Sequence, residues 1–110
     1  MNYTGSCHCG AVQFAFRCDE IRVAKRCNCS ICIRRGILVS PTYVALDRLE
    51  GAEALAEYRW ASKETAFRFC RTCGVHPFHE ADGLYRINLG CVAEVDALAL
   101  PVELIDGRAR

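Results

Sequence analysis

Three cysteines stand within six residues of one another in the stretch KRCNCSICIRRG, at Cys27, Cys29 and Cys32. Two closely spaced pairs accompany this cluster: Cys7 and Cys9 in GSCHCGAV, and Cys70 and Cys73 in FCRTCG. Grouped thiolates are the ligands that zinc prefers, and a closed structural zinc site takes four of them. Two closed sites would need eight cysteines, so the seven clustered cysteines predict one closed site and one site with an open position.

The spacing of each cluster allows its sulfurs to converge. Residues i and i+2 of an extended segment point to the same face, so Cys7 and Cys9 can share one ion. A C-x-x-C segment such as Cys70 to Cys73 forms a tight turn that does the same, and the glycine after it can adopt positive φ. We therefore predict a structural zinc site from these four residues, which closes a long loop and adds stability to a small core.

The remaining cluster, Cys27, Cys29 and Cys32, predicts a second zinc site with three protein ligands. Three ligands and an exchangeable fourth position are the pattern of a catalytic zinc. The fourth ligand is then water or a substrate sulfur, and such a site is expected to lose its metal more readily than the closed one. His76, His79, Cys18 and Cys91 are the alternative fourth ligands, and closure by one of them would favour a structural role.

Other chemistry remains open for these cysteines. Cys70 and Cys73 could form a redox pair, although that motif usually opens a helix after a strand. The cluster at Cys27, Cys29 and Cys32 could hold an iron–sulfur cluster with a fourth thiolate. A secreted disulfide framework is disfavoured, because the start of the chain lacks the pattern of a signal peptide. We therefore expect a cytoplasmic metalloprotein.

Composition limits the size of the scaffold and the class of partner. The chain has 110 residues, of which 52% are hydrophobic and 25% charged, and we expect a single zinc-binding domain over residues 1–110. The formal net charge is +1, which argues against a nucleic-acid partner. No apolar run approaches the roughly 20 residues of a membrane span, so no membrane partner is expected.

Short alternating segments predict the β-strands that must position the cysteines. Apolar residues alternate in AVQFAF (residues 11–16), AFRFC (66–70) and LYRINL (84–89), and PVELI (101–105) is a further candidate. Asp82-Gly83 suits a two-residue hairpin turn. The segment LDRLEGAEALAEYRW is ambiguous because its Ala, Leu and Glu content favours helix. We expect a short helical turn at 46–50 and a strand at 54–60.

The order of the motifs GSCHCGAV, CNCSIC and FCRTCG resembles the glutathione-dependent formaldehyde-activating enzyme family, which includes centromere protein V. The resemblance runs from about residue 3 to residue 92. It implies a mainly β fold with little helix, a β-tent of two curved antiparallel sheets stapled by zinc. It also implies that Cys7, Cys9, Cys70 and Cys73 bind a structural zinc, and that Cys27, Cys29 and Cys32 bind a catalytic one.

The activity implied by this resemblance is carbon–sulfur lyase chemistry. Glutathione and formaldehyde combine reversibly to form S-(hydroxymethyl)glutathione, so the expected partners are a small-molecule thiol and an aldehyde. Among the basic residues beside the second cluster, Arg34 and Arg35 are candidates for gripping a glutathione carboxylate. The alternative interpretation is a non-catalytic, zinc-stapled module that binds a protein or a nucleic acid.

Overall fold

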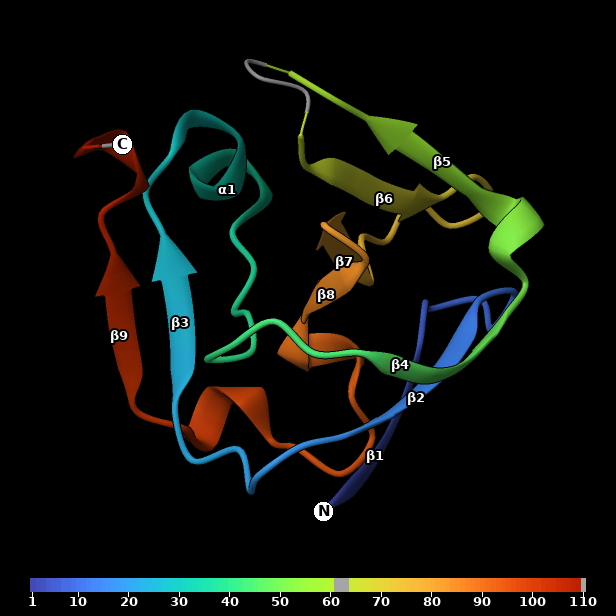
Figure 1. Cartoon of the computed structure of the whole chain (residues 1–110), viewed down its shortest axis with the longest axis horizontal. Coiled ribbons are helices and arrows are strands. Elements are labelled where there is room, and N and C mark those ends of the chain that lie inside the picture. Colours follow the sequence, from blue (N-terminus) through green and yellow to red (C-terminus); the bar gives the residue numbers. More distant parts are fainter. Residues whose placement is uncertain (61–63, 110) are drawn as a thin grey trace.

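Strands dominate the computed structural model, which describes residues 1–60 and 64–109. They form three sheets that surround a shared core (Figure 1). The described strands are β1 (Asn2–Ser6), β2 (Gln13–Arg17), β3 (Ala24–Cys27), β4 (Leu46–Glu50), β5 (Leu55–Tyr58), β6 (Ala66–Cys70), β7 (Phe78–Ala81), β8 (Leu84–Ile87) and β9 (Val102–Ile105). The mainly β fold class is therefore confirmed.

The first sheet has the order β1-β2-β4, and both of its pairings are antiparallel. The predicted alternation along β2 is observed, because Val12, Phe14 and Phe16 are all buried. The hairpin that joins β1 to β2 carries Cys7 and Cys9. This sheet therefore delivers the first cysteine pair from its turn.

The segment 46–50 is strand β4, so the helical turn expected there is wrong. Its residues pair with β2 in the register Phe14↔Leu49, and Leu46 and Leu49 pack against the core. Pairing and burial outweigh the helix propensity of the segment. A single 3₁₀ turn, Ala52–Ala54, follows β4, and the strand expected at 54–60 is observed as β5.

The largest sheet has the order β5-β6-β7-β8 and is antiparallel throughout. The predicted turn at Asp82-Gly83 joins β7 to β8, and both residues have positive φ, 54° and 76°. The loop between β6 and β7 carries Cys73 just beyond the last residue of β6, Cys70. This sheet therefore delivers the second cysteine pair.

A third ladder distinguishes the structure from a fold of two antiparallel sheets. β9 lies beside β3 and runs parallel to it, with Cys27 opposite Ile105 (Figure 1). The short helix α1 (Ser30–Arg35) follows β3 directly and ends at Gly36, which has a φ of 66°. The parallel pair and α1 together form the frame of the second cysteine cluster.

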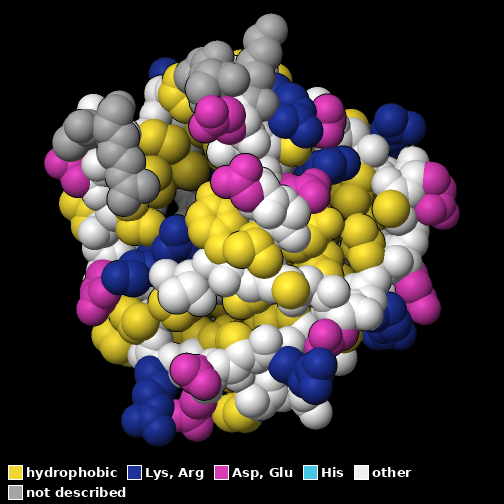
Figure 2. Space-filling model, in the orientation of Figure 1, with side chains coloured by type: hydrophobic (Ala, Val, Ile, Leu, Met, Phe, Trp, Pro, Cys, Tyr) yellow, Lys and Arg dark blue, Asp and Glu magenta, His cyan; other side chains and the backbone are white. Residues whose placement is uncertain are grey.

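Aromatic side chains fill the core where the sheets meet. Phe14 stacks on Phe16 and meets Phe78 edge to face, with a ring-centroid distance of 5.5 Å for the second pair. Ile87 and Leu89 are fully buried beside them. On the face shown in Figure 2, acidic and basic side chains are interspersed, which fits the near-neutral net charge. In the described ranges no helix is long and apolar enough to cross a membrane.

Candidate metal centres and active site

The structure brings the seven clustered cysteines into two separate groups. Within each group the sulfur atoms all lie within 4.8 Å of one another; the groups are Cys7, Cys9, Cys70 and Cys73, and Cys27, Cys29 and Cys32. In the described part of the chain, no further His, Cys, Asp or Glu joins either group at that distance. These are the same two sets of cysteines that the sequence groups.

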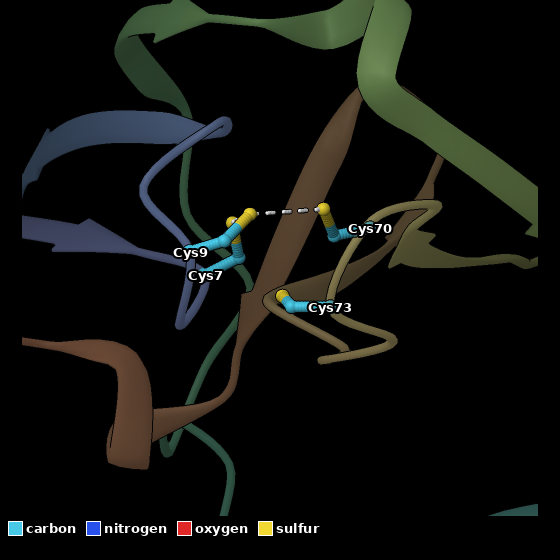
Figure 3. Close-up of side chains that lie close together, drawn as sticks. All are labelled: Cys7, Cys9, Cys70 and Cys73. Atoms are coloured by element: carbon cyan, nitrogen blue, oxygen red, sulfur yellow. Dashed lines mark hydrogen bonds between the residues drawn. The ribbon is translucent and has the colours of Figure 1, made fainter.

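The four-cysteine group joins two sheets. Cys7 and Cys9 come from the β1–β2 hairpin, and Cys70, at the end of β6, and Cys73, in the loop that follows, approach them from the other side (Figure 3). The Cys9 sulfur lies 3.6 Å from that of Cys7 and 3.7 Å from that of Cys70. Ligands on a tetrahedral zinc with bonds of about 2.3 Å are separated by about 3.8 Å, so this group fits zinc.

Backbone geometry prepares this group for an ion. The turns after Cys9 and Cys73 each contain a glycine at positive φ, Gly10 at 82° and Gly74 at 77°. These turns aim backbone N–H groups at the sulfurs, as when Val12 N–H donates to the Sγ of Cys7. Backbone N–H groups, first that of Val75, lower the pKa of Cys73 to about 6. A thiol that ionises this easily suits metal binding.

The three-cysteine group lies where β3 passes into α1. Cys27 is the last residue of β3, Cys29 occupies the N-cap position of α1, and Cys32 lies in the first turn of the helix. The backbone N–H of Cys29 donates to the Sγ of Cys27 at 3.4 Å. Burial raises the pKa of the Cys29 thiol, but hydrogen bonds led by the Cys32 backbone N–H lower it overall. This strand-to-helix turn gathers three sulfurs with no fourth ligand of the described chain beside them.

A cavity of about 220 Å³ opens onto these three thiols. Its walls are largely apolar and include Ile37, Val39 and Phe67. His79 and Arg86 are the polar residues on the wall formed by the large sheet, and sequence reasoning missed Arg86. Its signal was present in LYRINL, where Arg86 alternates with the inward-facing Tyr85 and Ile87.

The chain near its C-terminus closes one side of the cavity. Gly107 packs so tightly that a Cβ at this position would lie 2.5 Å from the Sγ of Cys27. Asn28 holds this segment in place, since its Oδ1 accepts from the backbone N–H of Arg108 and its Nδ2 donates to Asp106. The last described residues therefore form part of the second site.

Arg34 and Arg35 lie at the end of α1, outside this cavity. They line a wider groove of about 580 Å³ together with Ser30, Ile31, Tyr58 and Trp60. The Arg34 guanidinium donates to the Ser30 carbonyl, and the Arg35 guanidinium lies 6.0 Å from the Phe69 ring. The buried Nε of Arg35 has no hydrogen-bond partner among the described residues.

The candidate alternative ligands do not join the three sulfurs. His76 and His79 are buried, and neither belongs to the group within 4.8 Å, although His79 lines the same cavity. Cys18 and Cys91 are half-buried and stand outside both groups. In the described residues, the second group therefore keeps an open fourth position.

Known proteins resemble this chain in sequence and in fold. The model of the family described as glutathione-dependent formaldehyde-activating enzyme matches residues 2–105. The chain belongs to this family. A crystal structure of a Rhodobacter sphaeroides protein is similar to it at 32% sequence identity, with a TM-score of 0.76, covering 91% of this chain and 99% of that one. For this member of the formaldehyde-activating family, both cysteine groups could hold zinc.

Proposed function

We propose that this protein is a carbon–sulfur lyase that reversibly adds a thiol, glutathione or a related one, to formaldehyde or another small aldehyde. The observation that carries the proposal is the three-cysteine group, which faces a partly open, mostly apolar cavity and has an open fourth position. Family membership supports the substrate class. We assign Cys27, Cys29 and Cys32 as ligands of a catalytic zinc, and Cys7, Cys9, Cys70 and Cys73 as ligands of a structural zinc.

The two cysteine groups differ in what a bound metal would do. A zinc ion held by Cys27, Cys29 and Cys32 would lower the pKa of a fourth, substrate thiol and keep its sulfur beside the aldehyde. The residues of the chain supply the rest of the environment. Ile37, Val39 and Phe67 exclude water from the reacting carbon, which strengthens electrostatic interactions there.

The positive charge of the cavity comes from Arg86. Its guanidinium is fixed by hydrogen bonds to the carbonyl oxygens of Ser40, at 2.7 Å, and Pro41, at 3.0 Å. It also stacks over Tyr43 at 5.4 Å. A cation held in this way offsets the excess negative charge of several thiolates without leaving the site.

The size of the cavity separates the reacting groups from the rest of the thiol. A space of about 220 Å³ accommodates a thiomethyl group and a small aldehyde, but a tripeptide is too large for it. We assign the remainder of the thiol to the wider groove beside α1, where Arg34 and Arg35 would bind its carboxylates. Both arginines line this groove, so their guanidinium groups are placed to meet such carboxylates.

We place the reaction in the cytoplasm, where thiols remain reduced. All nine cysteines are unpaired in the structure, and the proposed chemistry needs at least three of them as free thiolates. Glutathione is abundant under the same conditions. The proposal therefore combines a reduced metal site with a reduced co-substrate.

The test combines metal analysis with an exchange assay. Zinc per chain is measured by mass spectrometry with and without reduced glutathione, and nuclear magnetic resonance follows exchange between S-(hydroxymethyl)glutathione and its components. We expect two zinc ions, of which glutathione protects the weaker, and exchange faster than the uncatalysed rate. Cys18→Ser, outside both groups, is the control. Zinc content indifferent to glutathione, without faster exchange, would instead favour a non-catalytic binding module.

A further inference from the structure

A row of three side chains crosses the large sheet and faces the cysteine cavity. Phe67 on β6 is the cross-strand partner of His79 on β7, and His79 is in turn the partner of Arg86 on β8. All three line the cavity that opens onto Cys27, Cys29 and Cys32. The strand register therefore places one imidazole between an apolar wall and a fixed cation, opposite the thiols.

His79 is buried between aromatic rings in this row. It is 7% exposed, with its ring centroid 5.0 Å from that of Phe67 and 5.8 Å from that of Tyr43. Its Nδ1 is buried and has no hydrogen-bond partner among the described residues. A buried orphan donor is rarer than a buried orphan acceptor, so the favoured tautomer carries its hydrogen on Nε2.

The imidazole stays neutral at physiological pH. Burial, then the charges of Arg86 and Arg35, lower the pKa of His79 to about 4. A neutral imidazole donates a hydrogen bond through one nitrogen without releasing a proton. In this form His79 can polarise a carbonyl oxygen, as neutral histidines do in enzymes that stabilise enolates.

We infer that His79 is a catalytic residue whose neutral imidazole donates a hydrogen bond to the aldehyde oxygen, and to the hydroxymethyl oxygen that forms from it. The inference rests on the proposed function. In the forward step the thiolate sulfur forms a bond to the carbonyl carbon, and the π electrons of the carbonyl move to its oxygen. The proton lost by the thiol returns to that oxygen through solvent, so no other reactant is needed.

The charge that develops in this step lies on the oxygen, where His79 and Arg86 converge. A preorganised donor at such a position is worth about 10²-fold to 10³-fold in kcat when it is removed from other enzymes. The apolar neighbours Phe67 and Val39 strengthen the bond by keeping water away. His79 thus stabilises this oxygen most strongly as negative charge develops on it.

His76 provides the matched control. It is a buried imidazole like His79, with ring centroids 5.7 Å apart, and both of its ring nitrogens lack described partners. It is not among the residues that line the cavity. A substitution at His76 should therefore disturb packing to a similar degree without touching the reacting oxygen.

The experiment compares His79→Met, which removes the donor, with His79→Gln, which keeps an N–H group on a side chain of similar length. Measured on zinc-loaded protein, we expect His79→Met to lower kcat at least tenfold with KM for the thiol within twofold of the parent. His79→Gln should recover to within about threefold of the parent, and His76→Met should leave kcat within twofold. An unchanged kcat in His79→Met, or an equal loss in both His79 variants, would overturn the inference.

A measurement on the parent protein keeps the inference testable if His79→Met does not fold. The side-chain ¹⁵N resonances of all three histidines are followed as glutathione and then formaldehyde are added. We expect the Nε2 resonance of His79 to shift on addition of formaldehyde, with exposed His8 unchanged. If the His79 resonance does not shift on addition of formaldehyde while exchange is catalysed, the inference about His79 is overturned and the proposed function is not. A parent protein without catalysed exchange overturns the proposed function and the inference together.

Discussion

The two cysteine groups consist of the same kind of side chain but are built from the chain in different ways. The first draws its ligands from two hairpins that are distant in sequence, with Cys9 and Cys70 61 residues apart. The second draws all three from one strand-to-helix turn, Cys27 to Cys32. A metal in the first therefore closes a long loop, whereas a metal in the second constrains only a local turn.

The surroundings of the two cysteine groups also differ. Cys7 and Cys70 are buried at 2% and 0% exposure and touch the main core. The second group instead faces a cavity with polar residues on one wall. Ligand count alone therefore does not separate structural from catalytic zinc. The sequence distance that the ligands span and the space beside them carry the rest of the distinction.

Removal of a ligand from the first group should have the largest effect. Cys70→Ser leaves three thiols in a site that joins two sheets, and structural zinc in small domains contributes about 10 kcal/mol or more. Because whole domains are stable by only about 5–15 kcal/mol, we expect this variant to be largely unfolded at 25 °C. Circular dichroism and thermal melting measure the loss. A cooperative melt close to that of the parent would contradict a structural role.

Removal of a ligand from the second group should leave the fold intact. For Cys29→Ser we expect a melting temperature within a few degrees of the parent, because this group closes no long loop. The protein should retain one zinc per chain and lose both glutathione-protected metal and catalysed exchange. Metal analysis beside the melt separates these effects. If Cys29→Ser unfolds as Cys70→Ser does, the contrast between the two groups fails.

Much of this contrast could be predicted from the sequence, because it depends on local spacing. The i, i+2 pairs and the C-x-x-C knuckle constrain sulfur positions within a few residues, and Asp82-Gly83 alone indicates a hairpin turn. The segment 46–50 was misjudged because helix propensity is a local signal, whereas its pairing with β2 is a tertiary one. Helix α1 was missed because six residues, SICIRR, carry too little periodicity.

The cavity wall was beyond sequence reasoning for a related reason. His79 and Arg86 face the thiols because β6, β7 and β8 pair in one particular register, and a shift by one residue would turn both to the other face. The parallel ladder of β3 and β9 joins segments about 80 residues apart, so no local sequence pattern predicts this pairing. Register and long-range pairing determine the site, while spacing determines its ligands.

His76, a buried histidine behind the cavity, should make the free energy of unfolding depend on pH. Burial first, then the charges of Arg35 and His79, lower the pKa of His76 from 6.5 to about 3. As pH falls below 6.5, the unfolded chain binds a proton that the folded chain does not, so stability declines until about pH 3. Between pH 7 and pH 5 this group should cost about 2 kcal/mol of unfolding free energy.

The substitution His76→Met should remove that cost. We expect the free energy of unfolding to depend less on pH in this variant than in the parent, and thiol protonation affects both proteins alike. Urea denaturation at pH 7, 6 and 5 measures the difference, with His8→Met at an exposed position as the control. Parallel pH curves for His76→Met and the parent would show that His76 is protonated within the fold.

The smallest predicted effect concerns residues 106–108, a strap that packs against the second group. Gly107→Ala would place a Cβ 2.5 Å from the Sγ of Cys27 and 3.0 Å from the Cβ of Cys29, so the strap or the thiols must move. Overpacking of this kind costs about 1–3 kcal/mol, and we expect zinc affinity at the second group to fall about tenfold. Chelator competition measures this zinc affinity, and the affinity of the first group should be unchanged.

Gly90→Ala is the matched control for this prediction. The nearest atom to the new Cβ in that variant is the Asn88 side-chain oxygen at 3.3 Å. Equal zinc affinity in Gly107→Ala and Gly90→Ala would mean that the strap lies against the thiols without shaping their geometry.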